Sequence, residues 1–249
     1  MQTRIRAPEV ARAATQIELG SVALRDVRKT FAAARRGADP VTALAGVSLQ
    51  AAPGEIVAVV GPSGCGKTTL LELVCGLVAP DGGSVDAAPA ALMAQRDLLL
   101  PWRSAVDNAA LALRVAGVGR DEAHARAAAL LDDFGLAGFG RSRPHELSGG
   151  MRQRVAFART LLSGRTVLCL DEPFAALDAL TRQEMQDWLA GALAVAPRTV
   201  VLVTHDVEEA IVLADRVVAA LDVPAQRPRA RTDPLLVALR ERALQELRR

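Results

Sequence analysis

Apolar and polar residues alternate near the start of the chain, over Ile17–Leu24 and again over Val41–Leu49. Alternation with a period of two is typical of a strand that buries one face, so we expect two half-buried strands here. The small, charged segment Ala32–Pro40 would form the loop between them. Later apolar runs also have the length of strands, and we expect these at Glu55–Val60, Ala91–Ala94, Thr166–Leu170, Thr199–Val203 and Arg216–Ala220.

Helical patterns lie between these later strands, over Lys67–Leu77, Leu180–Leu193 and Val207–Leu213. Strands that alternate with helices predict an α/β fold with a mainly parallel sheet covered on both faces. The two strands at the start would then form an antiparallel side sheet. Residues 97–165 are different, because they are rich in Ala, Leu and Arg and show little strand pattern. We interpret them as a helical subdomain inserted into the α/β core.

The two ends of the chain lack this alternation. Residues 1–14 are rich in Arg, Ala and Pro without periodicity, which predicts a loose tail. We expect one domain over residues 17–230. Within residues 231–249 a last helix is predicted, because Asp233 is a suitable N-cap and Pro234 suits the first helical position.

Composition limits the classes of protein that this chain can represent. It is 51% apolar and 23% charged, as packed proteins are, and a net charge of +2 does not predict nucleic-acid binding. No run approaches the roughly 20 apolar residues of a membrane-spanning helix, and no signal peptide is found, so a membrane role would require a partner. The three cysteines, an odd number without CxxC spacing, argue against a disulfide framework and fit a reducing cytosol.

A glycine-rich loop between a buried strand and a helix carries the first candidate chemistry. Its glycines allow several backbone N–H groups to face a phosphate, and the helix adds its positive end. Lys67, one of only two lysines in the chain, is expected to reach the β- and γ-phosphates, and Thr68 to offer its hydroxyl to Mg²⁺. The loop matches G-x-x-x-x-G-K-[ST] and, with the residue after it, comprises Gly61, Pro62, Ser63, Gly64, Cys65, Gly66, Lys67, Thr68 and Thr69.

Two acids directly follow the predicted strand near residue 170. In a parallel sheet, ligands bind beyond the carboxyl ends of the strands, which is where these acids would lie. We expect Asp171 to hold Mg²⁺, directly or through water, and Glu172 to act as the general base for the water that attacks the γ-phosphorus. Together with the glycine-rich loop, this pair predicts a P-loop NTPase.

The segment Leu147–Arg154, which reads LSGGMRQR, resembles the signature sequence of the ABC ATPase family. On its own chemistry, Ser148 can cap the helix that follows, while Gly149 and Gly150 leave the first N–H groups uncovered as an anion site. The resemblance implies a head-to-tail dimer in which each ATP lies between the Lys67 loop of one copy and the Ser148 helix of the other. The spacing alone does not show a dimer.

Other family elements occur in order, so that the resemblance covers residues from about 17 to 220. It implies that Gln95 contacts Mg²⁺ and the nucleophilic water, and that its loop transmits the nucleotide state to a membrane subunit. It further implies that His205 contacts the γ-phosphate and that Asp178 is the acid of a loop crossing the dimer interface. Phe31 is expected to stack on adenine, where the family often has a tyrosine; this chain has none.

The segment Leu98–Trp102, followed by Asp107-Asn108, is similar to importers of nitrate, sulfonates, taurine and pyrimidine vitamin precursors. This resemblance implies uptake of such a small polar solute. The implied partners are a second, identical ATPase subunit, a membrane permease that holds the chain at the cytoplasmic face of the plasma membrane, and a separate solute-binding protein. Three features depart from the family: Ala176 replaces the usual serine, Pro80–Ala94 is short enough to trim a hairpin of the side sheet, and the segment after Val218 is abbreviated.

Two other functions are compatible with the motifs. A soluble ABC ATPase of chromosomes would split its halves with a long coiled coil, but residues 96–147 carry no sustained heptads, and ribosomal members usually have two cassettes where this chain has one. A regulatory module would bind ATP without turnover; Glu172 and His205 argue against this, whereas Ala176 leaves it open. The sequence does not identify the cargo.

Overall fold

The computed structural model describes residues 19–32, 39–218 and 221–222. The predicted tail at residues 1–14 and the predicted helix within residues 231–249 lie outside these residues. Internal contacts divide the described chain into two units. We call residues 93–165 with 172–197 the helical unit, and the described parts of 19–92, 166–171 and 198–222 the sheet unit. That residues 17–230 form one domain stays a prediction.

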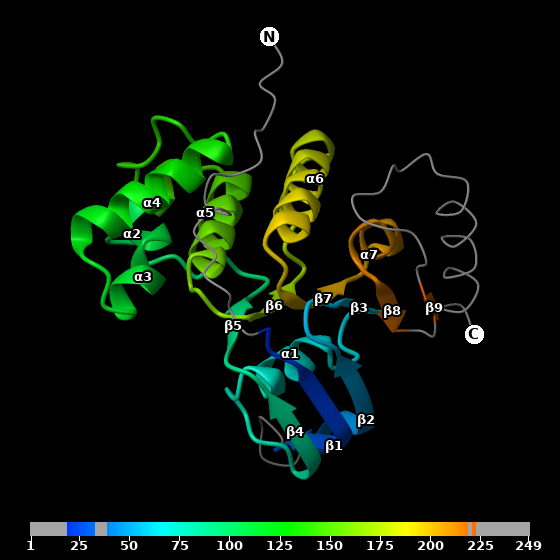
Figure 1. The fold of residues 1–249 in the computed structure, drawn as a ribbon. Helices are drawn as coiled ribbons and strands as arrows, with labels where there is room; N and C mark the ends of the chain where they lie inside the picture. Colours follow the sequence, from blue (N-terminus) through cyan, green and yellow to red (C-terminus); the bar gives the residue numbers. More distant parts are fainter. Residues whose placement is uncertain (1–18, 33–38, 219–220, 223–249) are drawn as a thin grey trace. The chain divides into compact units, whose positions relative to one another are not determined.

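An antiparallel side sheet in the order β2-β1-β4 forms one part of the sheet unit (Figure 1). The first strand lies later in the chain than predicted, since β1 spans Val22–Phe31. Alternation in the sequence stops at Leu24 because the strand is irregular between Leu24 and Val27, where Asp26 takes a φ of 49°. Such a bulge inserts an unpaired residue and returns the next apolar side chain to the buried face. The other two strands are β2 (Val41–Ala51) and β4 (Gly82–Ala87).

The strand β4 lies within Pro80–Ala94, the stretch expected to be short enough to trim a hairpin of the side sheet. Gly82 and Gly83 open the strand, and Gly83 has a φ of 79°. A Cβ atom at Gly83 would lie 2.3 Å from the carbonyl oxygen of Asp26, so that only glycine fits beside the bulge of β1. The short stretch after Pro80 therefore still gives the side sheet a strand, while its second half enters the larger sheet.

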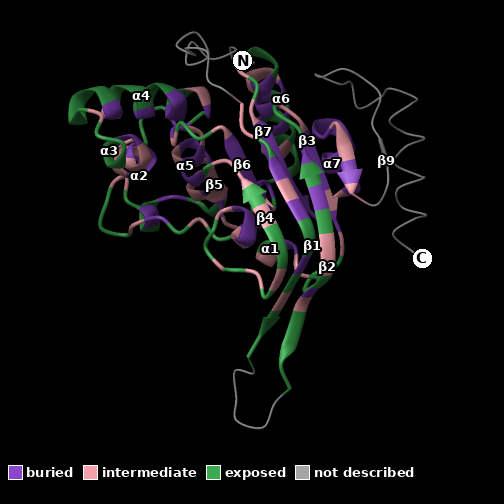
Figure 2. Cartoon of the chain, turned by 60° about the horizontal axis from the view of Figure 1, so that its bottom comes forward, coloured by how far each residue is buried: buried purple, intermediate pink, exposed green. Residues whose placement is uncertain are grey.

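The larger sheet has the order β5-β6-β7-β3-β8-β9. Its central strands β6, β7, β3 and β8 are parallel, which confirms the predicted sheet, and β6, β7 and β3 are mostly buried (Figure 2). The abbreviated segment after the predicted last strand still pairs, because β9 runs antiparallel to β8. The bounds are Ala90–Met93 for β5, Val167–Asp171 for β6, Thr199–Thr204 for β7, Ile56–Val60 for β3, Arg216–Val218 for β8 and Leu221–Asp222 for β9.

Two helices of the sheet unit position the phosphate loop and the end of β7. The helix α1 (Lys67–Val74) buries Leu70, Leu71, Leu73 and Val74 in a cluster with apolar residues of both sheets. It ends before the predicted Leu77, because Gly76 takes a φ of 67°, the left-handed conformation that stops a helix. The second helix, α7 (Val207–Leu213), has the predicted bounds.

The helical unit contains no strand between residues 97 and 165, all of which are described, as predicted. Its core is an aromatic cluster in which the ring of Trp188 lies 4.6 Å from Phe134 and 6.3 Å from Phe157. Within the described residues, no helix is long and apolar enough to cross a membrane. The helices are α2 (Ala105–Ala109), α3 (Leu111–Val115), α4 (Arg120–Asp133), the 3-10 turn η2 (Pro144–Glu146), α5 (Gly149–Leu161) and α6 (Ala179–Val195).

The helix α6 was assigned to the α/β core from its place between two strands. Contacts group it with the helical unit instead, because Trp188 and its neighbours face the same aromatic cluster as α5. Periodicity cannot distinguish these cases, since α6 is equally amphipathic in either environment.

Candidate active site

The glycine-rich loop connects β3 to α1 in the sheet unit. Gly66 has a φ of 94°, and a Cβ atom there would lie 2.3 Å from the carbonyl oxygen of Ala43 on β2. Both facts require glycine at this position. Gly66 is also the N-cap of α1, and no side chain caps that end. The first N–H groups of α1 are therefore left to an anion bound by the loop.

Lys67 is nearly buried, with 8% of its surface exposed. Its Nζ donates hydrogen bonds to the carbonyl oxygens of Gly61 at 2.8 Å and Pro62 at 2.7 Å, and lies 3.8 Å from the Sγ of Cys65. The ammonium group thus folds back into its own loop. An arginine would be harder to fit, because its planar fork cannot aim three donors at such closely spaced acceptors.

Thr68 and Asp171 meet at the carboxyl end of β6. The hydroxyl of Thr68 donates to the Oδ2 of Asp171 at 2.7 Å, and Asp171 is buried. A hydroxyl and a carboxylate are the oxygen donors that Mg²⁺ prefers, so this pair fits the predicted ion. The described residues hold no group of three His, Cys, Asp or Glu side chains arranged for a metal. Phosphate and water oxygens would therefore have to complete the shell, as is usual for Mg²⁺.

His205 follows β7, whose last residue Thr204 pairs in register with Val60 at the end of β3. The residue therefore leaves the same edge of the sheet as the phosphate loop. The turn is fixed by Asp206, which accepts hydrogen bonds from the backbone of Glu208 at 2.8 Å and Glu209 at 3.3 Å as the N-cap of α7. The sheet unit thus brings the loop, Asp171 and His205 to one edge.

Glu172 belongs to the helical unit, where it meets Gln95. The Nε2 of Gln95 donates to the Oε2 of Glu172 at 3.0 Å. Glu172 also has a φ of 47°, which is rare for a residue with a side chain and costs about 1–3 kcal/mol. Such a conformation persists only where the surrounding structure holds it, and such positions cluster at functional sites. Two predicted catalytic residues are therefore brought together.

The signature segment forms the N-terminus of α5 in the helical unit. Ser148 is the N-cap, and its side chain accepts a hydrogen bond from the backbone of Met151 at 3.2 Å, as predicted. Gly149 and Gly150 are the first helical residues. A Cβ atom at Gly150 would lie 3.2 Å from the Leu177 side chain, a close contact that this side chain would have to relieve by a small shift.

Asp178 has a structural position that the sequence analysis missed. It is the N-cap of α6, and its side chain accepts a hydrogen bond from the backbone of Thr181 at 3.1 Å. That bond lowers the pKa of the exposed Asp178 carboxyl group below its usual range. An Asp three residues before a Thr at the start of an apolar periodic run was the available signal.

Phe31 lies at the end of β1 with 38% of its surface exposed. The Nζ of Lys29 is 5.5 Å from the centre of its ring, within the range of a cation–π contact. Lys29 is held in turn by Asp81, at 2.9 Å from Nζ to Oδ1. The ring therefore has a cation as its neighbour while more than a third of the residue remains exposed.

An ion pair next to two predicted residues was also missed. The Nε of Arg152 donates to Asp97 at 2.9 Å, which joins α5 to the segment after Gln95. The two residues lie far apart in the sequence, and charged residues at that separation carry no pairing signal. Only the fold brings them together.

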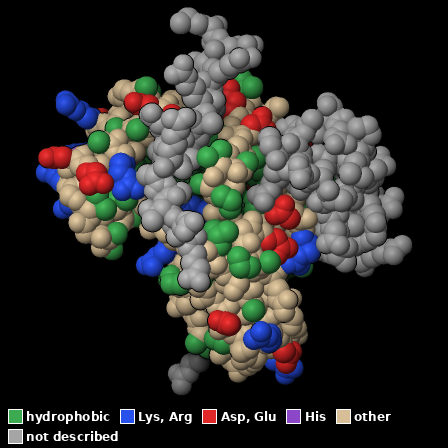
Figure 3. Space-filling model, viewed as in Figure 1, with side chains coloured by type: hydrophobic (Ala, Val, Ile, Leu, Met, Phe, Trp, Pro, Cys, Tyr) green, Lys and Arg blue, Asp and Glu red, His purple; other side chains and the backbone are tan. Residues whose placement is uncertain are grey.

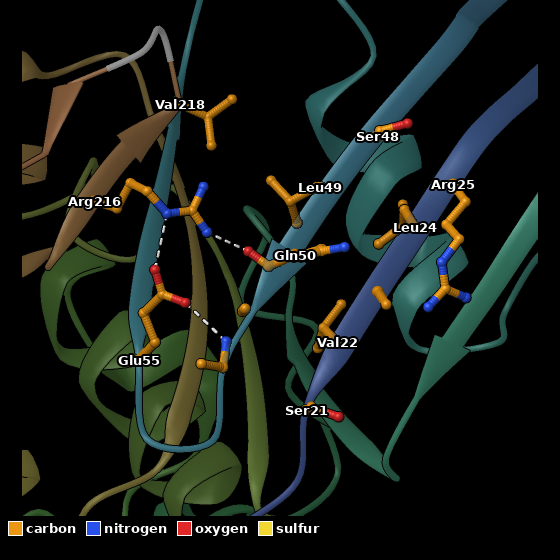
Figure 4. A pocket seen from close by; sticks show the side chains of 13 residues that line it. Ser21, Val22, Leu24, Arg25, Ser48, Leu49, Gln50, Glu55, Arg216 and Val218 are labelled. Carbon is orange, nitrogen blue, oxygen red and sulfur yellow. Dashed lines mark hydrogen bonds and ion pairs between the residues drawn. The ribbon is translucent and has the colours of Figure 1, made fainter.

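An open pocket of about 830 Å³ lies elsewhere on the sheet unit (Figure 4). On one side Glu55 accepts hydrogen bonds from Arg216 at 2.9 Å and from the backbone of Ala52 at 2.7 Å. Its lining includes none of the predicted site residues. On the face shown in Figure 3, acidic and basic side chains are interspersed.

Comparisons with known proteins agree with this geometry. The profile of the family described as "ABC transporter" matches residues 44–175. The aliphatic sulfonates import ATP-binding protein SsuB 1 of Rhodococcus jostii is 48% identical, covering 83% of this chain and 87% of that protein. The taurine import ATP-binding protein TauB of Burkholderia pseudomallei is 49% identical, covering 73% of each. The dimeric, post-hydrolysis structure of the ATP-binding cassette MJ0796 bound to ADP and Pi has a TM-score of 0.72 at 30% identity, covering 79% of this chain and 92% of that one.

Proposed function

The chain belongs to the ABC transporter family as one of its ATPases, and we propose that it hydrolyses MgATP to drive the import of a small sulfonate such as taurine. The observation that carries the proposal is the phosphate loop with Thr68 and Asp171 in hydrogen-bond contact at its end. The sulfonate and taurine import functions of the relatives support this class of cargo, and nitrate or a pyrimidine vitamin precursor is the alternative within the same group of importers.

Binding of the triphosphate is assigned to the sheet unit. The uncapped N-terminus of α1 and the Lys67 ammonium face the phosphates, and the ammonium exchanges its bonds to the loop carbonyls for bonds to phosphate oxygens. Thr68 and Asp171 would hold Mg²⁺. When bound, this ion neutralises the charge that develops between the β- and γ-phosphates. Phe31, which is partly exposed at the end of β1, would stack on the adenine ring.

Hydrolysis is assigned to Glu172, Gln95 and His205. The Glu172 carboxylate accepts a proton from the water molecule that attacks the γ-phosphorus. Its hydrogen bond with Gln95 supports this role, because a carboxylate fixed by an amide donor is oriented before the water arrives. His205 donates a hydrogen bond to a γ-phosphate oxygen, which carries more negative charge as the bond to the leaving oxygen breaks.

A second, identical copy supplies the other half of each ATP site. The N-terminus of α5 leaves the N–H groups of Gly149 and Gly150 without side-chain cover, so it can receive phosphate oxygens from the opposite copy. Asp178 would lie at the same interface. The dimeric form of the MJ0796 cassette supports this arrangement.

Transport requires partners that this chain does not contain. We assign it a membrane permease, which receives the movement of the helical unit through the segment after Gln95. A separate solute-binding protein would deliver the cargo. The chain would then reside at the cytoplasmic face of the membrane, held there by the permease.

The substitution Glu172→Gln tests the proposal. It should keep ATP binding, trap an ATP-bound dimer in light scattering, and lower phosphate release by about 10²–10⁴-fold, because the general base is lost. Cells that depend on this chain and its permease should stop accumulating labelled taurine.

Glu122→Gln is the matched control, since Glu122 is an exposed acid on α4 that pairs with Arg126, one turn further along the same helix. It should change neither turnover nor uptake. Normal phosphate release by Glu172→Gln would refute the assignment of the base.

A further inference from the structure

The guanidinium group of Arg152, in the helical unit, contacts two segments of the candidate site. In the proposed function, the segment after Gln95 acts on one ATP molecule and the turn before α5 contacts the other. The Nε of Arg152 donates to the Oδ2 of Asp97 at 2.9 Å, two residues after Gln95. Its NH1 atom donates to the carbonyl oxygen of Leu147 at 2.8 Å, the residue before Ser148. We call residues 95–100 the Gln95 segment. The planar guanidinium group of Arg152 therefore fixes the distance between this segment and the start of α5.

The Gln95 segment is held by a second arginine of α5. Arg159 donates from NH1 to the carbonyl oxygen of Leu98 at 2.9 Å and from NH2 to that of Asp97 at 2.8 Å. The other carboxylate oxygen of Asp97 accepts the backbone N–H of Leu99 at 3.2 Å. These bonds hold Leu98 at a φ of 45°, a conformation that needs such support.

The far end of the segment is fixed by Asn108, which is fully buried. Its Oδ1 accepts the backbone N–H of Leu100 at 2.8 Å, and its Nδ2 lies 3.2 Å from the carbonyl oxygen of the same residue. The segment 97–100 is thus tied at one end to α2 and along its length to α5. A displacement of α5 must move it, and with it the adjoining Gln95.

The ion pair between Arg152 and Asp97 adds little to the stability of the fold. Its side chains are 35% and 29% exposed, and exposed pairs are screened by water. What the pair determines is geometry, because it is a direct side-chain link between the turn that holds Ser148 and the segment that holds Gln95.

We propose that Arg152 is a positioning residue that couples the two ATP sites of the dimer. The inference rests on the proposed function, in which Ser148 of one copy contacts one ATP while Gln95 and Glu172 of that copy act on the other. Binding at the Ser148 turn then biases the placement of Gln95 and, through their hydrogen bond, of Glu172. The ion pair between Arg152 and Asp97 thus makes the position of Gln95 at one ATP site depend on whether ATP is bound at the other.

Steady-state ATP turnover by the full chain tests this coupling. The unaltered protein should show a sigmoidal dependence of rate on ATP concentration. Arg152→Gln and Asp97→Asn should each lower kcat about five- to tenfold and bring the Hill coefficient close to one. The double variant should lose no more than either single variant, because both remove the same link. Asp97→Glu keeps the carboxylate and should restore most of the sigmoidal response.

Three controls separate coupling from a structural defect. Arg126→Gln breaks a comparable exposed ion pair on α4 and should leave the rate curve unchanged. The affinity of the monomer for a fluorescent ATP analogue should stay within about twofold in all variants, since neither residue belongs to the phosphate loop. Their thermal midpoints should match that of the unaltered chain.

Several results would overturn the inference. These are an unchanged Hill coefficient in both single variants, losses that add in the double variant, or losses that follow a lowered thermal midpoint. If the unaltered chain turns over ATP and the variants give the same rate curve, the coupling is refuted and the proposed function is not. An unaltered chain without ATP turnover refutes the proposed function as well.

Discussion

Lys67 shows how a single residue type is selected by its surroundings. Its ammonium group lies inside a loop lined with carbonyl oxygens, where three donors on a compact charge are satisfied and a flat guanidinium is not. The chain uses arginine for nearly all its other cations, with Lys29 as the one other exception. The carbonyl oxygens around the ammonium group therefore explain why this position has a lysine in a chain that otherwise uses arginine almost throughout.

Lys67→Ala should weaken ATP binding about ten- to a hundredfold, because charge-assisted hydrogen bonds to the phosphates contribute about 1.5–3 kcal/mol. Titration calorimetry with ATP on the full chain measures the effect. Lys67→Arg keeps the charge and should still bind poorly, since the fork does not fit the loop. Unaltered affinity in Lys67→Ala would remove the assignment of the phosphate cradle.

At the scale of the element, several residues of the candidate site lie at the N-termini of helices. Ser148, Asp178 and Asp206 each cap a helix that begins at the predicted chemistry, and each accepts a backbone N–H within its first turn. Caps of this kind fix where a helix starts and hence where the residues beside it lie. The helix α2 has a cap of the same type, with a titratable partner.

Acid should weaken the helical unit through Asp107 in the first turn of α2. The Ser104 hydroxyl, at 2.6 Å, holds the pKa of the Asp107 carboxyl group below its ordinary 3.8, and His124 lies 2.9 Å away on α4. Because the folded pKa is lowered, the stabilisation is complete above pH 3.8 and is lost as the pH falls through the folded value.

Urea unfolding followed by circular dichroism at several pH values measures this loss. Asp107→Asn removes the titrating group and should flatten the dependence of unfolding free energy on pH in that range. Asp132→Asn, on the exposed side of α4, is the control. An equally steep acid dependence in Asp107→Asn would assign the effect to other carboxyl groups.

Element boundaries also show what local pattern can and cannot predict. The apolar runs of β3, β6 and β7 and the helix α7 were found because strong periodicity or continuous burial marks them. The end of β1 was predicted too early because a bulge after Leu24 breaks its alternation, and the end of α1 was wrong because Gly76 stops the helix within an apolar run. Both errors come from single backbone conformations that override periodicity.

At the scale of the whole molecule, the predicted site depends on long-range contacts to different degrees. The phosphate loop and the two acids were identified by spacing, because each is a continuous motif. The contact of Gln95 with Glu172, and that of Arg152 with Asp97, join residues distant in the chain and become visible only in the fold. Motifs therefore predicted the residues of the candidate site, while the packing of the chain determined which of them are in contact.

Mixing two inactive variants should restore activity if each ATP lies between two copies. Lys67→Ala disables the loop and Ser148→Glu places a negative charge at the α5 terminus, so either variant alone should hydrolyse little ATP. In a mixed dimer the intact loop of one copy faces the intact helix of the other. Random pairing then returns at most about a quarter of the unaltered rate.

Phosphate release from the equimolar mixture measures this complementation against each variant alone. A second mixture, of Lys67→Ala with Thr68→Ala, is the control. It should stay inactive, because both substitutions damage the loop and no mixed pair contains an intact one. A mixture of Lys67→Ala and Ser148→Glu that is no more active than its components would exclude the shared site.

Both tryptophans of the chain, Trp102 and Trp188, belong to the helical unit, and there is no tyrosine. Trp102 is 69% exposed beside the Gln95 segment, whereas Trp188 is buried against Phe134. Intrinsic emission therefore reports on this unit alone, with one indole sensing solvent and quenchers and the other sensing the apolar interior. Without any added label, the protein therefore carries an optical probe of the helical unit that is insensitive to the sheet unit and its glycine-rich loop.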